Sequence, residues 1–598
     1  MRRLRFVTLI ALALVASEAA AAGVKEATKD VSAARKIFEA NLDAIRRRDR
    51  EAYLACYLHS ETLARTGPDG PRLGFTAHEA QSKEDPWPEI FEGRDLELVP
   101  IRPGVVYGTY RYRVRYAAGD EHSGLSERVF LETKDGWKIA VTSAFEGPEG
   151  TPPPPVALTG ATLIDGRGGP PIAHAVVVLR GGKIDCAGAA RDCPIPEGVE
   201  RVDLAGLFIT PGIIDAHVHF SQTGWADGRP DSLDLRDRYP YEQVESELRA
   251  HPERWLRSYL CSGVTAVFDV GGYAWTWDLR ERSENDTQGP RVAAAGPLLS
   301  TLDHWLNLPA ERQFIYLADE KTARDGVRYL AAHHTSAVKV WFINNAARGF
   351  DDMAAAVMAA GDEAAARHLR LIVHATGLAE AKAALRAGAR MLVHSVWDLP
   401  VDDEFIALAK EKGTIYCPTL TVADGYYRMF ESMATGKPPV IDDPGECVDA
   451  ITLAHVASTP LEGAGKAEGF EARFARRDAM SQTMAANLKR VHAAGIPVAM
   501  GTDAGNPLTL HGPSIHAEME AMEAAGLTPM QVLLAATRGG ALAMDRDKDL
   551  GTVEAGKAAD LLVVAADPAA ATSHLRQVRY VVRGGVVRGA LELRAKRP

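Results

Sequence analysis

The sequence is poor in cysteine, in basic charge and in long apolar runs. It has 598 residues but only six cysteines, in which no disulfide framework of a small secreted domain can be read. The 79 Asp and Glu residues outnumber the 68 Lys and Arg residues, and the formal net charge of -11 disfavours nucleic acid and anionic membranes as partners. The composition, 46% hydrophobic and 25% charged, is that of a folded protein and argues against a multi-span membrane protein. We therefore expect a small-molecule or neutral partner.

The N-terminal segment has the pattern of a secretory signal peptide over residues 1–22. Arginines at positions 2, 3 and 5 precede the apolar run Phe6–Ala16, and four alanines follow at 19–22. A membrane anchor is the alternative, but the run is shorter than the roughly 20 residues that span a bilayer. No cysteine lies near the cleavage region, so a lipid anchor is not indicated. We expect an exported, periplasmic protein without stable membrane insertion after cleavage.

Residues 30–147 predict a small α+β domain. Apolar residues at helical spacing indicate two helices, and Tyr alternates with Arg along 110–116, which indicates a strand with one aromatic and one basic face. Asp135-Gly136 predicts a hairpin. The basic face is interpreted as solvated rather than as an anion site. The segment resembles a SnoaL-like domain, the cone-shaped fold of nuclear transport factor 2; such domains often pair, which would make the protein a homo-oligomer, and we assign this one no catalytic role.

Beyond a Pro-rich linker at 148–155 the pattern predicts an α/β catalytic region. Short Val-, Leu- and Ile-rich strands at 156–210 and again at 548–598 predict two parts of one small β-sandwich. Between them, over 211–547, eight strand-like segments alternate with amphipathic helices, which is typical of a TIM-like (β/α)8 barrel. Cys186 and Cys193 flank a short turn in the first sandwich part, and we hypothesise that they pair.

Six residues that could ligate metal fall at the ends of the predicted barrel strands. His217 and His219 are two apart, so strand periodicity places both imidazoles on one face. The C-terminal ends of the strands meet at one mouth of such a barrel, where active sites are built. The sequence therefore predicts a metal centre. Its residues, on strands 1, 4, 5, 6 and 8, are His217, His219, Lys339, His374, His394 and Asp503.

The motifs ITPGIIDAHVHF, VKVWF, LIVHATG, LVHS, MGTDAG and LGTVEAGKAADLLVV resemble the amidohydrolase superfamily, and within it the imidazolonepropionase-like and Xaa-Pro dipeptidase-like branch. The resemblance covers roughly residues 156–590. It implies one or two divalent metals, expected to be two Zn, with Mn, Fe and Co as alternatives. It also implies ligand roles: His217, His219 and Asp503 for the first metal, His374 and His394 for the second, and a carbamylated Lys339 bridging them.

Lys339 leaves two interpretations open. An ammonium cannot ligate a cation, whereas the carbamate formed from the neutral amine and CO2 is an anionic ligand with two oxygens. Alternatively, Lys339 stays charged and binds a substrate carboxylate, and a single-metal site results. In either case Asp503 is the expected general base and then general acid, taking the proton of the attacking water and returning it to the departing nitrogen.

Other residues are expected around the substrate. His304, Tyr416 and His511 are candidates for substrate contacts, although ordinary packing explains Tyr416 and His511 equally well. The loop TGWADGRPD after the two histidines is expected to shape the pocket wall. A connection of over 50 residues, from Ala423 to about Arg477, is unusually long and is predicted to form a lid that admits only small molecules.

We therefore predict a metal-dependent amidohydrolase that cleaves an amide C–N bond in a small molecule, a dipeptide or an N-acyl amino acid. The first alternative is a mononuclear, imidazolonepropionase-like enzyme that opens a cyclic amide. The second is a binding or assembly protein with a vestigial barrel, which the full ligand set argues against.

Overall fold

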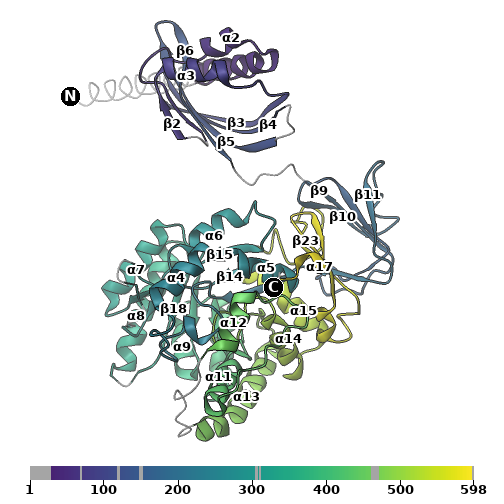
Figure 1. The fold of residues 1–598 in the computed structure, drawn as a ribbon. Helices are drawn as coiled ribbons and strands as arrows, with labels where there is room; N and C mark the ends of the chain where they lie inside the picture. The colour runs from purple at the N-terminus through teal and green to yellow at the C-terminus, as the bar shows by residue number, and fades with distance from the viewer. Residues whose placement is uncertain are drawn as a thin grey trace, which may run out of the picture. The chain divides into compact units, whose positions relative to one another are not determined.

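The computed structural model describes residues 28–67, 70–116, 121–146, 153–303, 307–308, 311–345, 347–459 and 470–595 (Figure 1). The chain forms two compact units that divide between Thr151 and Pro152. The predicted signal peptide and His304 lie outside the described residues. Within the described ranges, no helix is both long and apolar enough to cross a membrane.

The first unit packs helices against a six-stranded sheet of order β2-β1-β6-β5-β4-β3. A helix over residues 28–47 buries Phe38 and Leu42 in a core shared with the inward face of the sheet. The other helices are α2 (Arg50–Ala55), which begins where Asp49 accepts the amide of Ala52, and α3 (Phe75–Glu84). The strands are β1 (Ala64–Gly67), β2 (Gly70–Leu73), β3 (Ile90–Arg102), β4 (Val105–Arg115), β5 (Glu121–Thr133) and β6 (Gly136–Glu146).

Strand β4 has the two faces that its sequence predicts. Tyr110, Tyr112 and Val114 are buried, while the alternating arginines lie on the other face and are partly exposed. Acidic residues at and beside β3 pair with those arginines at 3.7 to 4.0 Å. The predicted hairpin at Asp135-Gly136 is also confirmed, because it joins the antiparallel strands β5 and β6.

The second unit begins and ends in two small sheets that share one apolar core. The first has the order β10-β9-β7-β11: β7 (Val156–Thr159), β9 (Ala175–Arg180), β10 (Lys183–Ala189) and β11 (Glu200–Asp203). The second has the order β24-β23-β22-β12-β8: β8 (Thr162–Leu163), β12 (Phe208–Pro211), β22 (Leu561–Val564), β23 (Val578–Arg583) and β24 (Val586–Gly589). Strands from both ends of the unit therefore pair directly, β12 with β22.

Two disulfides tie this unit together. Cys186 and Cys193 pair across the turn after β10, as hypothesised from their spacing. Cys261 pairs with Cys447 over 186 residues, a link that the sequence did not reveal. Cys56 and Cys417 are free and buried.

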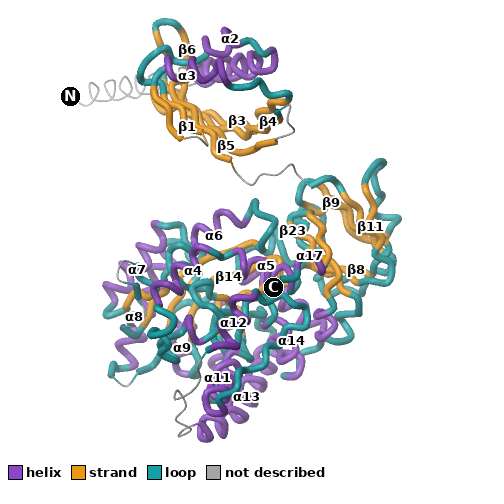
Figure 2. The backbone as a smooth tube through the Cα atoms, in the orientation of Figure 1, coloured by secondary structure: helices purple, strands orange, loops and turns teal. Residues whose placement is uncertain are grey.

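Between β12 and β22 in the sequence, the unit has mixed α/β structure built on parallel strands. Figure 2 shows these strands surrounded by helices. One sheet holds β13 (Ile213–Val218), β14 (Val264–Asp269) and β15 (Arg291–Ala294). The other holds β16 (Leu298–Ser300), β17 (Phe314–Tyr316), β18 (Val338–Trp341), β19 (Leu371–His374), β20 (Met391–Val393) and β21 (Ile415–Cys417). Nearly all their residues are buried, as parallel strands covered on both faces require.

The helices follow the strands in sequence. They are α4 (Tyr241–Ala250), α5 (Glu253–Cys261), α6 (Thr276–Ser283), α7 (Glu320–Ala332), α8 (Phe350–Ala366), α9 (Leu378–Arg386), α10 (Asp403–Lys412), α11 (Val422–Thr435), α12 (Ala450–Ser458), α13 (Phe470–Ala493), α14 (Ser514–Ala524), α15 (Pro529–Leu534), α16 (Gly540–Ala543) and α17 (Ala590–Leu593). Helices α11 and α12 and the start of α13 occupy the long connection predicted as a lid.

Backbone hydrogen bonds connect the two parallel sheets at both sides. The amide of Ser336 donates to Ala294, linking the β15 and β18 ends, and the amide of Ala216 donates to Met500. Tyr416 in turn donates to Pro497, so residues 497–500 lie between β21 and β13. The two parallel sheets are therefore linked to each other at both sides. As a result, the strand ends that carry the predicted ligands come together.

Two predicted strands differ from expectation. Strand 3 is split into β15 and β16 because Gly296 between them has a left-handed φ of 66°. Strand 8 is reduced to isolated bridges at Val498 and Ala504. Asp503 has a φ of 63°, which extended backbone does not allow, so the ladder stops where the site begins.

Candidate metal centre

The centre is built around Asp503, His217 near the end of β13 and His219 just after it. Oδ1 of Asp503 lies 3.2 Å from Nε2 of His217 and 3.0 Å from Nε2 of His219. The two Nε2 atoms are 3.2 Å apart. Nδ1 of His219 lies 2.6 Å from the carbonyl oxygen of Gly271. A carbonyl only accepts, so Nδ1 carries the proton and Nε2 presents its lone pair toward Asp503.

His394 completes a group of three residues with metal-ligand spacing. One ligand atom each from His217, His394 and Asp503 lies within 4.8 Å of the others, and all three residues are buried. Nδ1 of His394 is 2.7 Å from Oγ1 of Thr419 and 4.0 Å from Oδ2 of Asp503. His394, Thr419 and Asp503 all have left-handed φ angles, of 72°, 43° and 63°. Such strain persists only where the surrounding structure enforces it, and it gathers at functional sites.

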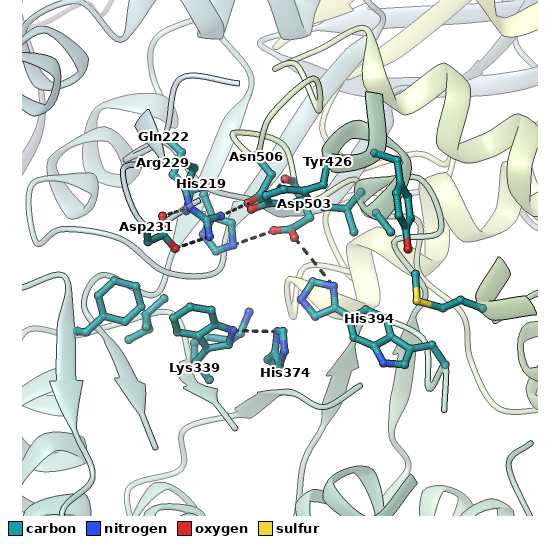
Figure 3. Close-up of a pocket in the computed structure, with 18 of the residues that line it drawn as sticks. His219, Gln222, Arg229, Asp231, Lys339, His374, His394, Tyr426, Asp503 and Asn506 are labelled. Carbon is teal, nitrogen blue, oxygen red and sulfur yellow. Dashed lines mark hydrogen bonds and ion pairs between the residues drawn. The ribbon is translucent and has the colours of Figure 1, made fainter. Parts of the chain in front are cut away.

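Lys339 and His374 lie beside this group (Figure 3). Nζ of Lys339 is 3.4 Å from Nε2 of His217, and the rings of His374 and His394 are 4.4 Å apart. Nε1 of Trp341 donates to Nδ1 of His374 at 3.1 Å. All six predicted residues come together, and His394 lies beside His374 as well as close to His217 and Asp503.

Burial keeps the site's nitrogens in the form that can bind a metal. It lowers the pKa of His217, His374 and His394 well below the usual value, so these imidazoles are neutral. Burial also lowers the pKa of Lys339 to about 8, against the opposing effect of Asp503. Nδ1 of His217 and Oδ1 of Asp503 are buried without a hydrogen-bond partner. Neutral imidazoles, a carboxylate and orphaned ligand atoms fit a divalent cation such as Zn.

The group faces a cavity of about 400 Å³. The loop predicted to shape the wall contributes Arg229 and Asp231, and Arg229 donates to both carboxylate oxygens of Asp231 at 2.8 Å. The guanidinium also donates to Asn506, which accepts from the hydroxyl of Tyr426 at 2.6 Å. This network fixes the polar side of the cavity (Figure 3).

Other walls of the cavity are apolar, and the long connection supplies part of them. Side chains of this kind from β16, β17, β18, α11 and α13 are Leu298, Phe314, Trp341, Val422, Ala423, Tyr426, Tyr427, Phe430 and Met480. The sequence did not single out Trp341, Asn506 or Tyr426. Trp341 had a usable signal, since it is two residues after Lys339 on the same strand and therefore shares its face.

Two of the three weaker substrate candidates, Tyr416 and His511, do not line the cavity. His304 lies outside the described residues. Tyr416 is 1% exposed, and its hydroxyl accepts from the amide of Val396. His511 is buried between the hydroxyl of Tyr259 at 2.9 Å and the carbonyl of Gln222 at 2.8 Å. The polar atoms of Tyr416 and His511, which were expected to face a substrate, are therefore hydrogen-bonded to other groups of the protein.

Parallel strands that deliver neutral imidazoles and a carboxylate to one apolar cavity define a metal-dependent hydrolase. The Amidohydrolase family model matches residues 208–590, and the chain belongs to this family. It is a hydrolase of amide C–N bonds. Members of the family bind divalent metals.

Curated relatives and solved structures agree with this assignment. An imidazolonepropionase of Caulobacter vibrioides is 27% identical over 430 residues, covering 67% of this chain and 90% of the relative. An ochratoxinase of Aspergillus niger is 24% identical over 456 residues, covering 69% and 82%. The structure of a Xaa-Pro dipeptidase with bound methionine in the active site superposes with a TM-score of 0.55 at 21% identity, over 73% of this chain and all of that one. Such fold neighbours imply a TIM-like barrel.

Proposed function

We propose that the protein hydrolyses the amide bond of a dipeptide or N-acyl amino acid at this centre. The observation that carries the proposal is the buried group of His217, His394 and Asp503 at the base of a cavity of about 400 Å³. That volume suits a small molecule. Relatives named imidazolonepropionase, ochratoxinase and Xaa-Pro dipeptidase support a small substrate with an amide bond.

The residues that would hold the metal are His217, His219, His394 and Asp503, with Lys339 and His374 adding a second ion if Lys339 is carbamylated. Zn is the first choice, with Mn, Fe and Co as alternatives. Bound there, a divalent cation supplies Lewis acidity toward a carbonyl oxygen and lowers the pKa of water. The lowered pKa of Lys339 supports the carbamate, because the neutral amine is the form that reacts with CO2.

The chain's own residues would move the proton and exclude solvent. Asp503 takes the proton of the attacking water on a carboxylate oxygen and returns it to the departing nitrogen. The buried setting of Asp503, 6% exposed, keeps competing water away from that proton. The aromatic side chains of α11, Tyr426 and Phe430, cover the apolar part of the substrate as a lid.

The polar side of the cavity would orient the substrate. Arg229 is held by Asp231 and Asn506, so its charge is largely balanced inside the protein. We propose that Arg229 and Asp231 together act as a rigid hydrogen-bonding wall. We also propose that apolar contact with Phe314 and Trp341 selects the side chain of the substrate. A substrate with one apolar or aromatic group fits a cavity that is divided in this way into a polar and an apolar side.

A mononuclear enzyme that opens a cyclic amide is the second candidate. Its support is that His217, His394 and Asp503 by themselves place three ligand atoms within 4.8 Å of one another, which suffices for a single ion. The matched imidazolonepropionase of Caulobacter vibrioides is consistent with it.

We further propose the wider organisation expected from the sequence. Residues 1–22 serve as a signal for export to the periplasm, 30–147 form a SnoaL-like accessory domain that pairs two chains, and 148–155 link it to the catalytic part. The sheets at 156–210 and 548–598 are then one β-sandwich beside a TIM-like (β/α)8 barrel over 211–547.

One experiment tests the proposal. Purified protein of measured metal content is incubated with dipeptides, N-acyl amino acids and cyclic amides, and release of amine is followed. Turnover of linear amides at two metals per chain is the expected result. Turnover of cyclic amides alone at one metal per chain favours the second candidate. Inactivity toward the whole panel in metal-loaded protein would falsify both.

A further inference from the structure

The catalytic unit contains a second cavity, of about 280 Å³, beside the loop that follows β13. Helices α4, α5 and α12 line it together with three residues of that loop, Thr223, Trp225 and Asp227. Among the described residues of its lining, none belongs to the candidate metal centre. A cavity of this volume suits a small molecule rather than a peptide chain.

Two N–H donors on α5 are left without a partner at this cavity. Trp255 is 2% exposed, and its Nε1 is buried with no hydrogen-bond partner in the described ranges. Nε of the preceding Arg254 is buried and unpartnered in the same way. The guanidinium carbon lies 4.5 Å from the centre of the Trp255 ring, so the two donors belong to one stacked pair. Buried donors are normally satisfied by protein, water or a ligand, and a ligand that fills this cavity must therefore bring an acceptor.

The nearest carboxylate does not satisfy Arg254. Oδ1 of Asp449 lies 3.8 Å from Nη1 of Arg254, which is too long for a hydrogen bond. The same carboxylate already accepts from the amides of Ile451 and Thr452 and from the hydroxyl of Thr452. Asp449 is thus held at the start of α12, and the guanidinium keeps donors for another acceptor.

Charges of both signs surround the cavity. Arg238 and Arg254 are basic, whereas Asp227 and Glu247 are acidic. Asp227 is buried, and its two oxygens lie 2.5 Å from Oγ1 of Thr223 and 2.7 Å from Nδ1 of His455. Glu247 is exposed on α4 and presents its carboxylate at the rim. Balanced charges disfavour a simple anion or cation and favour a ligand that carries one charge of each sign.

The remaining walls are aromatic and aliphatic. Tyr239 and Trp255 supply rings, and the buried side chains of Val244 and Leu248 lie on α4. Aromatic faces attract an ammonium group, and the apolar surface suits a hydrocarbon or aromatic side chain. Carboxylates are the strongest acceptors for guanidinium N–H groups. A carboxylate, an ammonium and an apolar side chain on one small molecule are the parts of an amino acid.

We infer that this second cavity is a binding site for a free amino acid with an aromatic or large apolar side chain. The carboxylate of the ligand accepts from Trp255 Nε1 and from the guanidinium of Arg254. Its ammonium group faces Glu247, and its side chain lies against Tyr239 and Leu248. The inference is independent of the reaction proposed for the metal centre.

The loop after β13 reaches both cavities. Asp227 lines the second cavity, whereas Arg229 and Asp231 line the catalytic one. An amino acid in the second cavity therefore lies against the loop that shapes the polar wall of the catalytic cavity.

Crystals of the unaltered chain soaked in 4-bromo-L-phenylalanine test the site without any variant. Anomalous scattering from bromine beside Tyr239 and Trp255 supports the inference, whether or not bromine is also found at the metal centre. Only water or a buffer ion in the second cavity, with bromine elsewhere or nowhere, overturns it.

Calorimetry with L-phenylalanine on the full, metal-loaded chain measures the affinity. One site should lose affinity by about tenfold or more in Arg254→Met, because a hydrogen-bonded charge pair is removed. The matched control is Arg249→Met, an exposed arginine of α4 that does not line the cavity, and it should bind as the parent does. Binding at the metal centre is common to all three chains and cancels in the comparison. Equal binding by the Arg254→Met and parent chains contradicts the inference.

A second ligand tests whether the site reads the ammonium group. 3-Phenylpropionate has the carboxylate and the ring of phenylalanine but no ammonium. Glu247→Gln should weaken the binding of L-phenylalanine by about threefold, as expected for an exposed ion pair, and leave that of 3-phenylpropionate unchanged. An equal effect on both ligands, or no effect on either, overturns the assignment of an amino acid.

Discussion

Asp215 and Thr502 lie 287 residues apart in the chain and are joined by two hydrogen bonds. The amide of Thr502 donates to Oδ1 of Asp215 at 3.0 Å, and its hydroxyl donates to Oδ2 at 2.6 Å. The same Oδ1 accepts from the amide of His217 at 3.2 Å. One buried carboxyl therefore fixes the backbone of His217 and that of the residue before Asp503, which brings two proposed ligands into register.

The variant Asp215→Asn should fold but position the centre poorly. Its amide oxygen still accepts from the backbone, whereas its NH2 group replaces the acceptor of the Thr502 hydroxyl. Groups that orient metal ligands typically contribute about 10- to 100-fold in metal affinity or activity. We expect a loss of this size in kcat/KM, measured together with metal content. Asp185→Asn, an exposed carboxylate on β10, is the control and should match the parent. Unchanged kcat/KM in the Asp215 variant would show that the link is structural only.

Replacing Asp503 by Asn should separate proton transfer from folding. An amide cannot accept the proton of the attacking water, so hydrolysis should fall by about 10²- to 10⁴-fold. Helix content and melting temperature should stay near those of the parent, because the side chain is nearly isosteric. Circular dichroism, metal analysis and steady-state kinetics on the same preparation give the answer. Near-parental turnover would remove Asp503 from the mechanism.

The two disulfides should differ in their effect on stability. In the chain-entropy model, cross-linking residues 186 apart restricts the unfolded chain far more than cross-linking residues 7 apart. We expect about 5 kcal/mol from Cys261–Cys447 and about 2 to 3 kcal/mol from Cys186–Cys193. Paired Cys→Ser variants of each, compared by thermal unfolding of the catalytic unit, test this order. Equal shifts would contradict the entropic account.

Two buried groups on α14 should oppose each other in the pH dependence of stability. Burial raises the pKa of Glu518 to about 7 from 4.5, so its contribution is full below pH 4.5 and is lost as pH rises toward 7. Burial lowers the pKa of His516 to about 3 from 6.5, so its contribution is full above pH 6.5 and is lost as pH falls toward 3.

Glu518→Gln should therefore make stability rise more steeply between pH 4.5 and 6.5, by about 2 to 3 kcal/mol relative to the parent. His516→Phe serves as the reciprocal control and should tilt the slope the other way. Urea unfolding at several pH values in that interval measures both. Parallel curves for the three proteins would mean that neither group titrates as described.

Much of the candidate site could be predicted from the strands alone. His217, His219, Lys339, His374 and His394 belong to or directly follow strands whose residues are almost continuously apolar, and such runs are readable in the sequence. Asp503 was also placed at the end of a predicted strand, the eighth, although its segment forms only isolated bridges. The distances between these side chains could not be predicted, because they depend on side-chain directions set by the left-handed backbone at His394 and Asp503.

By itself, the sequence determined the α/β character of the catalytic unit, the alternating faces of β4 and the six residues that gather at the candidate metal centre, since these follow from local periodicity and strand order. Only the tertiary structure decided the features that depend on long-range contacts. These are the Cys261–Cys447 disulfide, the hydrogen bonds between Asp215 and Thr502, and the internal hydrogen bonds of Tyr416 and His511. Each of these contacts joins segments that are distant along the chain, or directs a side chain toward one of several neighbours. Local sequence patterns do not predict which partner is formed.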